Sequence, residues 1–408
     1  MNRAVKILVA GVAINLCMGV LYAWSVFSKA LQAELGWSAV DAGMPYSIAV
    51  MAFASCLLLS GILQDRMGPR KMVILGCSMV AIGLMVSSFA SSPLTLALSF
   101  GGLVGAGIGF AYACLSPAAM KWFHSSKKGL VCGLIAGGFG MAPLFLAPLT
   151  NYLIDSFGIN STFLIFGIAT LLIAVPLAFT IVNPPEGYVA EAPAGYVAPA
   201  GKEGGNDFNW RQMLKTKQFY MLWVMFCFSA SAGLMLIGNI TSIAATQGGL
   251  TSAAFLVSAL AVFNSGGRVV MGMLSDKIGA IRTLLLVFVL QGINMLLFPM
   301  YQSEMGFMFG AALAGVGYGA LLAVFPSLTA DYYGLKNYGT NFGVLYTSWG
   351  VSGFIGPVIA GYVSAAYGSY AIAYTVSAIG LAIALVLGLM IKPVTQDQAQ
   401  PESAPVKA

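Results

Sequence analysis

Charge is scarce in this sequence. Asp, Glu, Lys and Arg make up 8% of its 408 residues, whereas a globular domain carries roughly 25%. Hydrophobic residues account for 59%. A soluble surface cannot be built from this composition, which excludes soluble enzymes and nucleic-acid-binding domains. Low charge with abundant large apolar side chains also excludes an intrinsically disordered chain.

Histidine and cysteine are too few and too scattered for a metal or redox site. The one histidine, His124, falls in a polar loop, and the six cysteines all fall within apolar stretches without metal-ligand spacing. No carboxylate is expected at mid-span, so a membrane enzyme lacks its nucleophile, base or metal ligands. We therefore expect no catalytic residue, no metal site and no cofactor.

Long apolar stretches fill most of the chain. A spanning helix needs about 20 apolar residues, and backbone groups in lipid must be satisfied within their own segment. The sequence therefore predicts an all-α membrane protein with twelve transmembrane helices, near 5–28, 41–64, 71–91, 94–120, 129–154, 160–182, 218–246, 251–275, 280–301, 305–330, 339–366 and 369–391.

Basic residues are distributed unequally over the two faces of this arrangement. Of the 19 Lys and Arg residues, 17 fall on one side, Lys29 on the other and Arg268 within a helix. The positive-inside rule makes the basic side cytoplasmic and places both termini there, in a multi-pass protein of the plasma (inner) membrane. The net charge of +6 belongs to this asymmetry, so no nucleic-acid partner is expected.

The chain divides into two similar halves. We expect an N-terminal six-helix bundle over 1–182, a cytoplasmic linker over 183–217, a C-terminal six-helix bundle over 218–392 and a cytoplasmic tail over 393–408. Within the linker, 208–220 has the pattern of a short amphipathic helix at the membrane surface. The motif GILQDRMG at 61–68 recurs as GMLSDKIG at 272–279, 211 residues later, and Gly129 recurs as Gly339 after 210. Such a duplication is typical of transporters that alternate access to a site between their halves.

The motif GILQDRMGPRK at 61–71 resembles the loop signature of the major facilitator superfamily, and the resemblance covers essentially the whole chain. Further segments resemble its monocarboxylate and oxalate:formate porter branch, and within it bacterial lactate transporters of the monocarboxylate type. They are GVLYAWS at 19–25, YGALLAVFP at 318–326, LYTSWG at 345–350, and Asn264 with Arg268. The resemblance implies the major facilitator fold, with two pseudo-symmetric six-helix bundles, and secondary active transport.

Arg268 is the predicted centre of the site. It precedes Asp276 by eight residues, about 12 Å along a helix, which places it deep in the hydrocarbon. A buried guanidinium is costly unless it faces a cavity and has a partner, and no Asp or Glu falls at mid-span. A substrate carboxylate fits its planar fork. The alternative is a structural arginine that binds backbone carbonyls or reaches the inner interface.

Asn264 lies four residues before Arg268 and so shares its helix face. The resemblance to animal monocarboxylate transporters implies an aspartate at this position, paired with the arginine and involved in proton coupling. Asparagine cannot titrate, so that relay is not expected in the same form. Asn264 either orients Arg268 or binds the substrate, with a plain helix–helix hydrogen bond as the alternative.

Aromatic residues near mid-helix complete the predicted site. The resemblance implies that their helices line the cavity, so we expect an aromatic box around a small anion, with plain packing as the alternative for each ring. The set is Tyr22, Tyr112, Phe139, Tyr318, Tyr346 and Trp349. In oxalate-carrying relatives the position of Trp349 holds a lysine. A single cation in an aromatic cavity favours a monoanion.

Asp65 and Asp276 occupy equivalent positions in the repeated motif, beside basic residues that include Arg70. The resemblance implies that these loops latch the halves together when the cytoplasmic side is closed, which makes Asp65, Arg70 and Asp276 gating residues. A topology signal alone accounts for the basic residues but not for the repeated aspartate.

The sequence therefore predicts a monomeric transporter, not an enzyme, with a small monocarboxylate, a proton and the lipid bilayer as its partners. Lactate and pyruvate-like acids are the expected substrates. The alternative is an organic-anion antiporter of the oxalate:formate type, which requires a second cation in the cavity.

Overall fold

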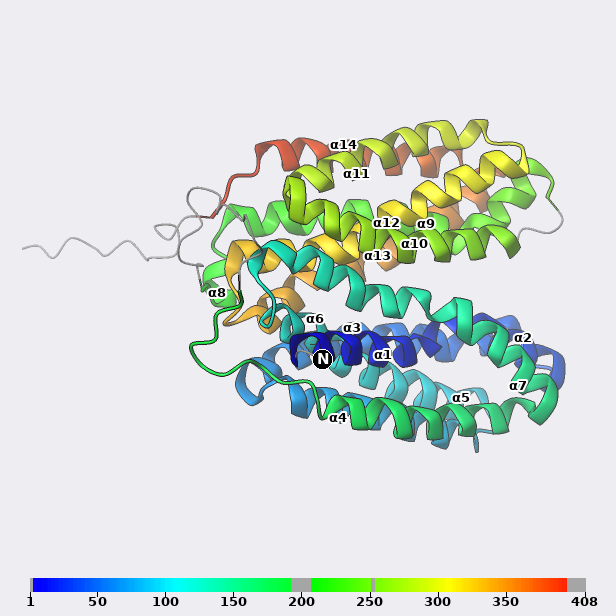
Figure 1. Ribbon diagram of the computed structural model, residues 1–408. Coiled ribbons are helices and arrows are strands. Elements are labelled where there is room, and N and C mark those ends of the chain that lie inside the picture. The colour runs from blue at the N-terminus through cyan, green and yellow to red at the C-terminus, as the bar shows by residue number, and fades with distance from the viewer. Residues whose placement is uncertain (1–2, 192–206, 251–253, 395–408) are drawn as a thin grey trace, which may run out of the picture.

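The computed structural model describes residues 3–191, 207–250 and 254–394, and every regular element within them is helical. Two helical bundles lie side by side, α1 to α7 in one and α9 to α14 in the other (Figure 1). The all-α membrane fold predicted from the sequence is confirmed.

The first bundle contains α1 to α7. A 3₁₀ turn joins α1 to α2, and a π-helical segment, Ala97–Val104, joins α5 to α6, so each of these pairs forms one long rod. The helices are α1 (Arg3–Met18), α2 (Trp24–Leu35), α3 (Ala39–Met67), α4 (Pro69–Ser87), α5 (Pro93–Leu96), α6 (Gly105–Met120) and α7 (Lys128–Ala178).

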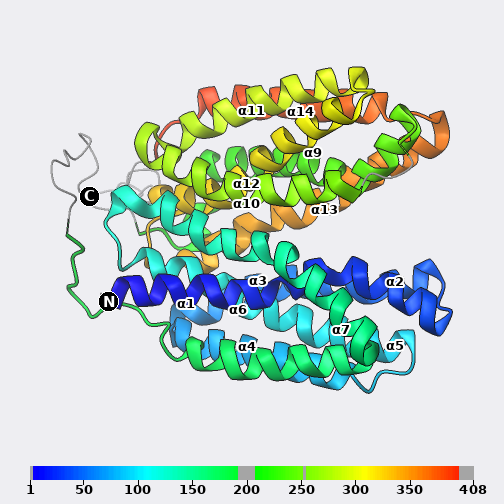
Figure 2. The same cartoon turned by 45° about the vertical axis from the view of Figure 1, so that its right-hand side comes forward.

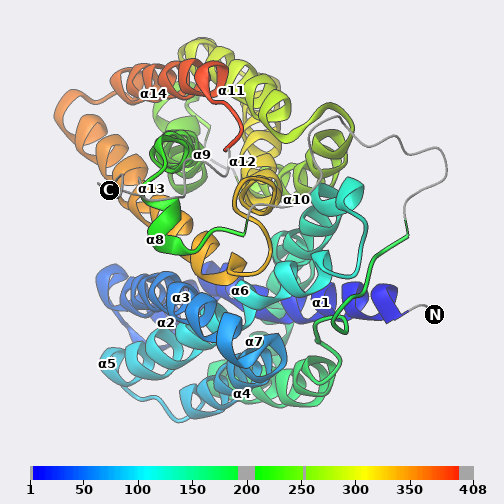
Figure 3. The same ribbon diagram turned by 90° about the vertical axis from the view of Figure 1, so that its left-hand side faces the viewer.

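The second bundle contains the helices after the linker. They are α9 (Lys217–Gly248), α10 (Ala254–Ile278), α11 (Ala280–Leu297), α12 (Glu304–Tyr333), α13 (Tyr338–Tyr367) and α14 (Ala371–Met390), with the short α8 (Trp210–Met213) before them. Figure 3 shows the two groups of helices end-on.

Eleven segments of the described chain are long and apolar enough to cross a membrane. One of them contains α7, whose 51 residues at about 1.5 Å each far exceed a hydrocarbon core of about 30 Å. Gly158 breaks α7 with φ 79° and ψ 167°, a conformation that favours glycine. The helix therefore crosses twice, which gives the twelve spans expected from the sequence.

Both bundles begin and end on the same side of the molecule. The start of α1, the end of α14 and α8 lie on the left in Figure 1, and the 45° rotation in Figure 2 keeps α1 and α14 in this arrangement. We call this side the linker face. It is the side that the sequence predicts to be cytoplasmic.

The predicted surface helix over 208–220 is wrong in extent, because the helix covers only Trp210–Met213. Thr216 caps α9 by accepting a hydrogen bond from the N–H of Phe219, and this separates α8 from α9. Phe208 and Met213 are buried, and the hydroxyls of Thr216 and Tyr333 lie 3.0 Å apart. The segment therefore packs on α12. Residues 192–206 of the predicted linker and 395–408 of the predicted tail lie outside the described residues.

Two helix pairs cross between the bundles at the linker face, α3 with α13 and α10 with α7. Their backbones approach so closely that a Cβ atom at Gly61 would lie 2.1 Å from the carbonyl oxygen of Gly339. In the equivalent crossing, a Cβ at Gly272 would lie 2.3 Å from the carbonyl oxygen of Gly129. Glycine is therefore required where the linker face is closed.

We predict that Gly61→Ala opens the linker face, since its methyl group and the Gly339 carbonyl cannot occupy the same space. The measurement is labelling of Tyr338→Cys by a thiol reagent, in a background without the natural cysteines. Tyr338 is 1% exposed, so labelling should become several-fold faster when the bundles separate.

The matched control is Gly43→Ala on the same helix, where a Cβ meets nothing within 4 Å. It should leave the labelling rate unchanged. Equal rates in the two variants would contradict a backbone contact that depends on Gly61.

Candidate functional site

Arg268 lies between the two bundles and is fully buried at 0% exposure. Its Nε donates a hydrogen bond to Asn264 Oδ1 at 3.0 Å, and its Nη1 donates one to the carbonyl of Ala136 in α7. Nη2 is buried without a hydrogen-bond partner. The guanidinium therefore connects α10 of one bundle to α7 of the other and keeps one nitrogen free.

Arg268 thus has two protein partners, both of kinds considered from the sequence. A bond to a backbone carbonyl, the alternative considered from the sequence, holds for one nitrogen. Both acceptors are neutral, however, and within the described residues the one ion pair is Lys128–Asp331 at 3.1 Å. The protein orients the positive charge of Arg268 without neutralising it.

A small cavity lies against Arg268. Its free volume is about 10 Å³, and its walls come from α3, α6, α7, α10, α12 and α13 together with the 3₁₀ turn after α1. The lining residues are Tyr22, Phe53, Tyr112, Phe139, Arg268, Leu322, Tyr346 and Trp349. Six of the eight residues predicted from the sequence thus line one cavity.

The rings around the cavity contact one another. Tyr346 and Trp349 stack with their centroids 5.1 Å apart, and Tyr22 meets Phe139 edge-to-face at 4.9 Å. Tyr112 packs on Phe139 at 5.5 Å. Interlocked rings have few alternative rotamers, so they define a rigid, largely apolar wall around the one charge.

The two remaining predicted residues lie behind the wall and support it. Asn264 accepts the Nε–H of Arg268, the orienting role weighed from the sequence. Tyr318 accepts the indole N–H of Trp349 at 2.7 Å, so the polar atoms of both rings are satisfied away from lipid. Neither residue lines the cavity.

Two lining residues, Phe53 and Leu322, were not predicted. Phenylalanine and leucine are too common in an apolar chain to attract notice singly. The internal repeat does indicate them, because each is the equivalent of a predicted residue in the other half. Phe53 precedes Asn264 by 211 residues, and Leu322 follows Tyr112 by 210. Extending each predicted residue to its equivalent in the other half would have identified both.

Asp65 and Asp276 each cap a helix of the opposite bundle at the linker face. Asp65 accepts hydrogen bonds from the N–H groups of Gly339 and Thr340, at 3.1 and 2.8 Å, and from the Thr340 hydroxyl. Asp276 accepts the N–H groups of Gly129 and Leu130 at 2.7 and 2.8 Å. A carboxylate at a helix N-terminus satisfies free donors and the helix dipole, so the two contacts hold the bundles together.

Arg70 is not part of these contacts. It is exposed and lines a separate cavity within the first bundle. The cation that does join the bundles at this face is Lys128 of α7, whose Nζ pairs with Asp331 of α12 at 3.1 Å. These two residues stand 203 positions apart, so no sequence pattern predicts their contact.

Comparison with known proteins supports this architecture. The profile of the Major Facilitator Superfamily matches residues 8–301 and 230–407. The chain belongs to the major facilitator superfamily. It is 27% identical over 399 residues to the oxalate:formate antiporter of Oxalobacter formigenes, covering 96% of this chain and 92% of that one.

Other relatives are transporters as well. The uncharacterized MFS-type transporter YhjX of Escherichia coli (strain K12) is 29% identical over 84% of each chain. Monocarboxylate transporter 12-B of Danio rerio is 26% identical over 80% of this chain and 73% of its own. Membership of the superfamily thus makes the chain a transporter and not an enzyme.

Solved structures confirm the fold at low sequence identity. The superfamily transporter FucP in its outward conformation superposes with a TM-score of 0.74 at 14% identity, covering 95% of this chain and 99% of its own. The proton:xylose symporter XylE gives 0.74 at 12% identity over 96% of each chain. With this fold, the twelve apolar spans make the chain a multi-pass membrane protein.

We predict that Asp65→Asn and Asp276→Asn shift the transporter toward a state open at the linker face. Each variant loses the charge–dipole attraction and turns an amide N–H₂ toward backbone donors. A loss of about 1–2 kcal/mol would change the equilibrium about five- to thirtyfold. Labelling of Tyr338→Cys measures the shift.

Asp41→Asn is the control, since that carboxylate also lies on α3 but accepts a hydrogen bond from Ser38 of its own cap at 2.7 Å. It should not change the labelling. Unchanged accessibility together with weaker substrate binding in Asp65→Asn would contradict a latch and indicate a role in the site.

Proposed function

We propose that this protein moves small monocarboxylates, with lactate and pyruvate-like acids foremost, across the membrane by alternating access and together with a proton. The observation that carries this proposal is the single cation of the aromatic cavity, Arg268, whose Nη2 is buried without a partner. The protein offers Nη2 no acceptor and places no negative charge beside the guanidinium, and a substrate carboxylate would supply both.

The chemistry of the cavity favours an anion over a neutral ligand. An unsatisfied buried donor costs about 1–3 kcal/mol, and more when it is charged. A carboxylate oxygen bound to Nη2 removes that cost, while Nε and Nη1 stay on Asn264 and the Ala136 carbonyl. The two bonds hold the fork in place before the substrate arrives, which reduces the ordering that binding requires.

The size and wall of the cavity favour a short, singly charged acid. The free space against Arg268 is only about 10 Å³, roughly the room of one water molecule, so the site has no room for a bulky ligand. Seven of the eight lining side chains are aromatic or aliphatic, and they suit a small hydrocarbon group. A second carboxylate would enter this environment without a cationic partner, at a cost of several kcal/mol.

The names of the relatives support the same class of substrate. The oxalate:formate antiporter and monocarboxylate transporter 12-B are named for small carboxylic acids. None of the cavity-lining residues is a carboxylate or a histidine, so we propose that the coupled proton is carried outside the cavity wall. We further propose that the protein works as a monomer in the inner membrane, with the linker face and both termini cytoplasmic, as the distribution of basic residues predicts.

The alternative function is exchange of organic anions, which the 27% identity to the antiporter over 96% of this chain favours. Proteoliposomes separate the two. A symporter accumulates labelled lactate when only a pH gradient is imposed, whereas an exchanger needs an internal anion and ignores the gradient. Uptake that depends on preloaded formate or oxalate would replace the first proposal by the second.

We predict that Arg268→Ala and Arg268→Lys both abolish concentrative lactate uptake. Losing one partner of a buried charge pair costs about 2–5 kcal/mol, at least about thirtyfold in affinity. Lysine keeps the charge but cannot bind Asn264, the Ala136 carbonyl and a carboxylate from one planar group. Gly266→Ala on the same helix, where a Cβ meets nothing within 4 Å, is the control and should transport normally. Near-normal uptake by Arg268→Ala would make the arginine structural.

We also predict that position 349 sets the charge of the substrate. Trp349→Lys should weaken lactate transport and admit oxalate, because a second cation then faces the cavity that Trp349 lines. Competition of labelled lactate uptake by unlabelled acids measures the change. Trp349→Phe is the matched control, which loses the bond to Tyr318 but gains no charge and should still reject oxalate. Oxalate that competes as well as lactate in the wild type would refute the single-cation argument.

A further inference from the structure

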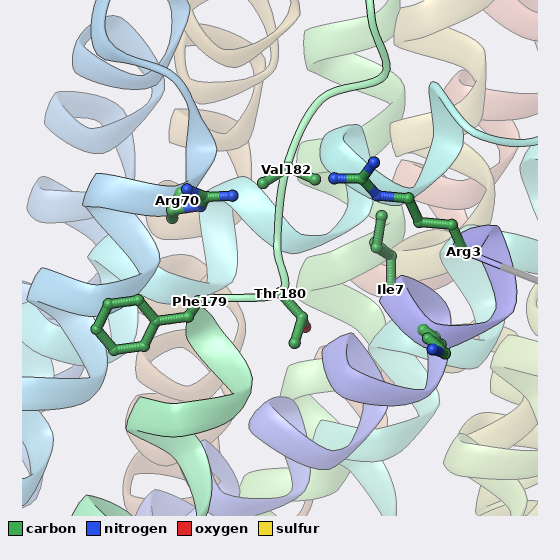
Figure 4. Close-up of a pocket in the computed structure, with 7 residues that line it drawn as sticks. Arg3, Ile7, Arg70, Phe179, Thr180 and Val182 are labelled. Carbon is green, nitrogen blue, oxygen red and sulfur yellow. The ribbon is translucent and has the colours of Figure 1, made fainter.

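A second cavity lies at the linker face, in the side of the first bundle and away from Arg268. Its volume is about 340 Å³, and it is open to the outside, between the start of α1, the start of α4 and the chain just after α7 (Figure 4). Its lining residues are Arg3, Lys6, Ile7, Arg70, Phe179, Thr180 and Val182. Nothing in the transport mechanism above uses this cavity.

The cavity is strongly positive. Three of its seven lining residues are cations, Arg3, Lys6 and Arg70, and none is a carboxylate. Within the described residues none of the three forms an ion pair. The N-terminus of α4 adds to the positive potential, because its N-cap is Gly68, which has no side chain to satisfy the first N–H groups. Several cations at an uncapped helix start form an anion-binding environment.

The wall of the cavity is held in place by Trp122. Its ring carries the guanidinium of Arg3 at 5.4 Å from the centroid, and its indole N–H donates a hydrogen bond to the Val182 carbonyl at 2.7 Å. The guanidinium groups of Arg3 and Arg70 both point toward the segment around Val182 (Figure 4). One buried tryptophan therefore fixes both a cation and the backbone beside it, which a mere topology signal does not require.

Apolar side chains lead from the cavity along the membrane-spanning surface. Phe179 lines the cavity at 57% exposure, and Leu172 lies seven residues earlier on α7 at 68%. Val5 and Val9, four residues apart on α1, are 37% and 52% exposed. Residues at these spacings share a helix face. The cavity thus combines a cationic pocket at the membrane boundary with an apolar surface that runs into the hydrocarbon.

We propose that this cavity binds the phosphate group of an anionic phospholipid of the cytoplasmic leaflet, with its acyl chains along α1 and α7. The phosphate lies among Arg3, Lys6 and Arg70 near the start of α4. A free phosphate ion would bind the same cations, but it has no apolar part to contact the exposed Phe179 and Leu172. Basic pockets between spanning helices on the cytoplasmic side are suited to such lipids.

Native mass spectrometry of the purified full chain, titrated with phosphatidylglycerol or phosphatidylcholine, tests the proposal. The wild type should retain phosphatidylglycerol in preference to the zwitterionic lipid. Arg3→Gln and Arg70→Gln should each weaken its binding about fivefold, and the double variant roughly twenty-five-fold, as expected for about 1 kcal/mol per cation. Arg3→Lys should retain most of the affinity, which separates loss of charge from a disturbed fold.

The control is Lys71→Gln combined with Arg282→Gln. It removes two exposed cations from the starts of α4 and α11 without touching the cavity. Phosphatidylglycerol binding should match that of the wild type. If this control loses as much phosphatidylglycerol binding as the double variant of the cavity, the effect comes from general surface charge and the proposal is overturned. Displacement of the lipid by millimolar inorganic phosphate would overturn it too, in favour of a soluble anion.

Discussion

The hydrogen bond from Arg268 to the Ala136 carbonyl joins the cavity beside Arg268 to the contact between the two bundles. Both residues belong to the crossing of α10 and α7, which also carries the cap of Asp276 on Gly129 and Leu130. Along this crossing a Cβ at Gly133 would lie 2.2 Å from the carbonyl oxygen of Arg268. Cavity and latch therefore share one rigid contact. A carboxylate bound to Nη2 would therefore act on the same contact that closes the linker face.

The duplication supplies two such crossings, but only one carries a charge. Counting back 211 residues from Asn264 and Arg268 gives Phe53 and Leu57 on α3, both buried and apolar. The latch is symmetric, because Asp65 and Asp276 make equivalent bonds to opposite helices. The cavity beside Arg268 is not symmetric, because only one half supplies an arginine to it. A symmetric scaffold is typical of alternating access, and the one unmatched arginine supports our proposal of a site for one negative charge.

Much of this arrangement follows from the sequence alone. Hydrophobic runs, the distribution of basic residues and the repeat predict the spans and the two halves, since lipid permits few other structures. Arg268, Tyr112 and Trp349 stand out because polar or bulky groups at mid-span are costly without a purpose. The sequence could not predict the hydrogen bond to the Ala136 carbonyl. Every residue has a backbone carbonyl, and only packing decides which one meets the guanidinium. Phe53 and Leu322 line the cavity but cannot be distinguished in the sequence from many other apolar residues. Arg70 is a gating residue only by resemblance, and in the structure it lines another cavity.

The neutral acceptors of Arg268 bear on the transport cycle. A carrier that returns without its anion must take the arginine through the closed state, where a bare charge costs several kcal/mol. Asn264 Oδ1 and the Ala136 carbonyl supply two oriented dipoles for that passage, although they leave Nη2 unsatisfied. A carboxylate at Asn264 would neutralise the charge fully, but it would also compete with the substrate for the guanidinium. Partial stabilisation of the guanidinium lets the unloaded carrier return, while the unsatisfied Nη2 still favours the binding of an anion. That balance suits net uptake of a monocarboxylate better than obligatory exchange, in which the arginine is never required to cross without its substrate.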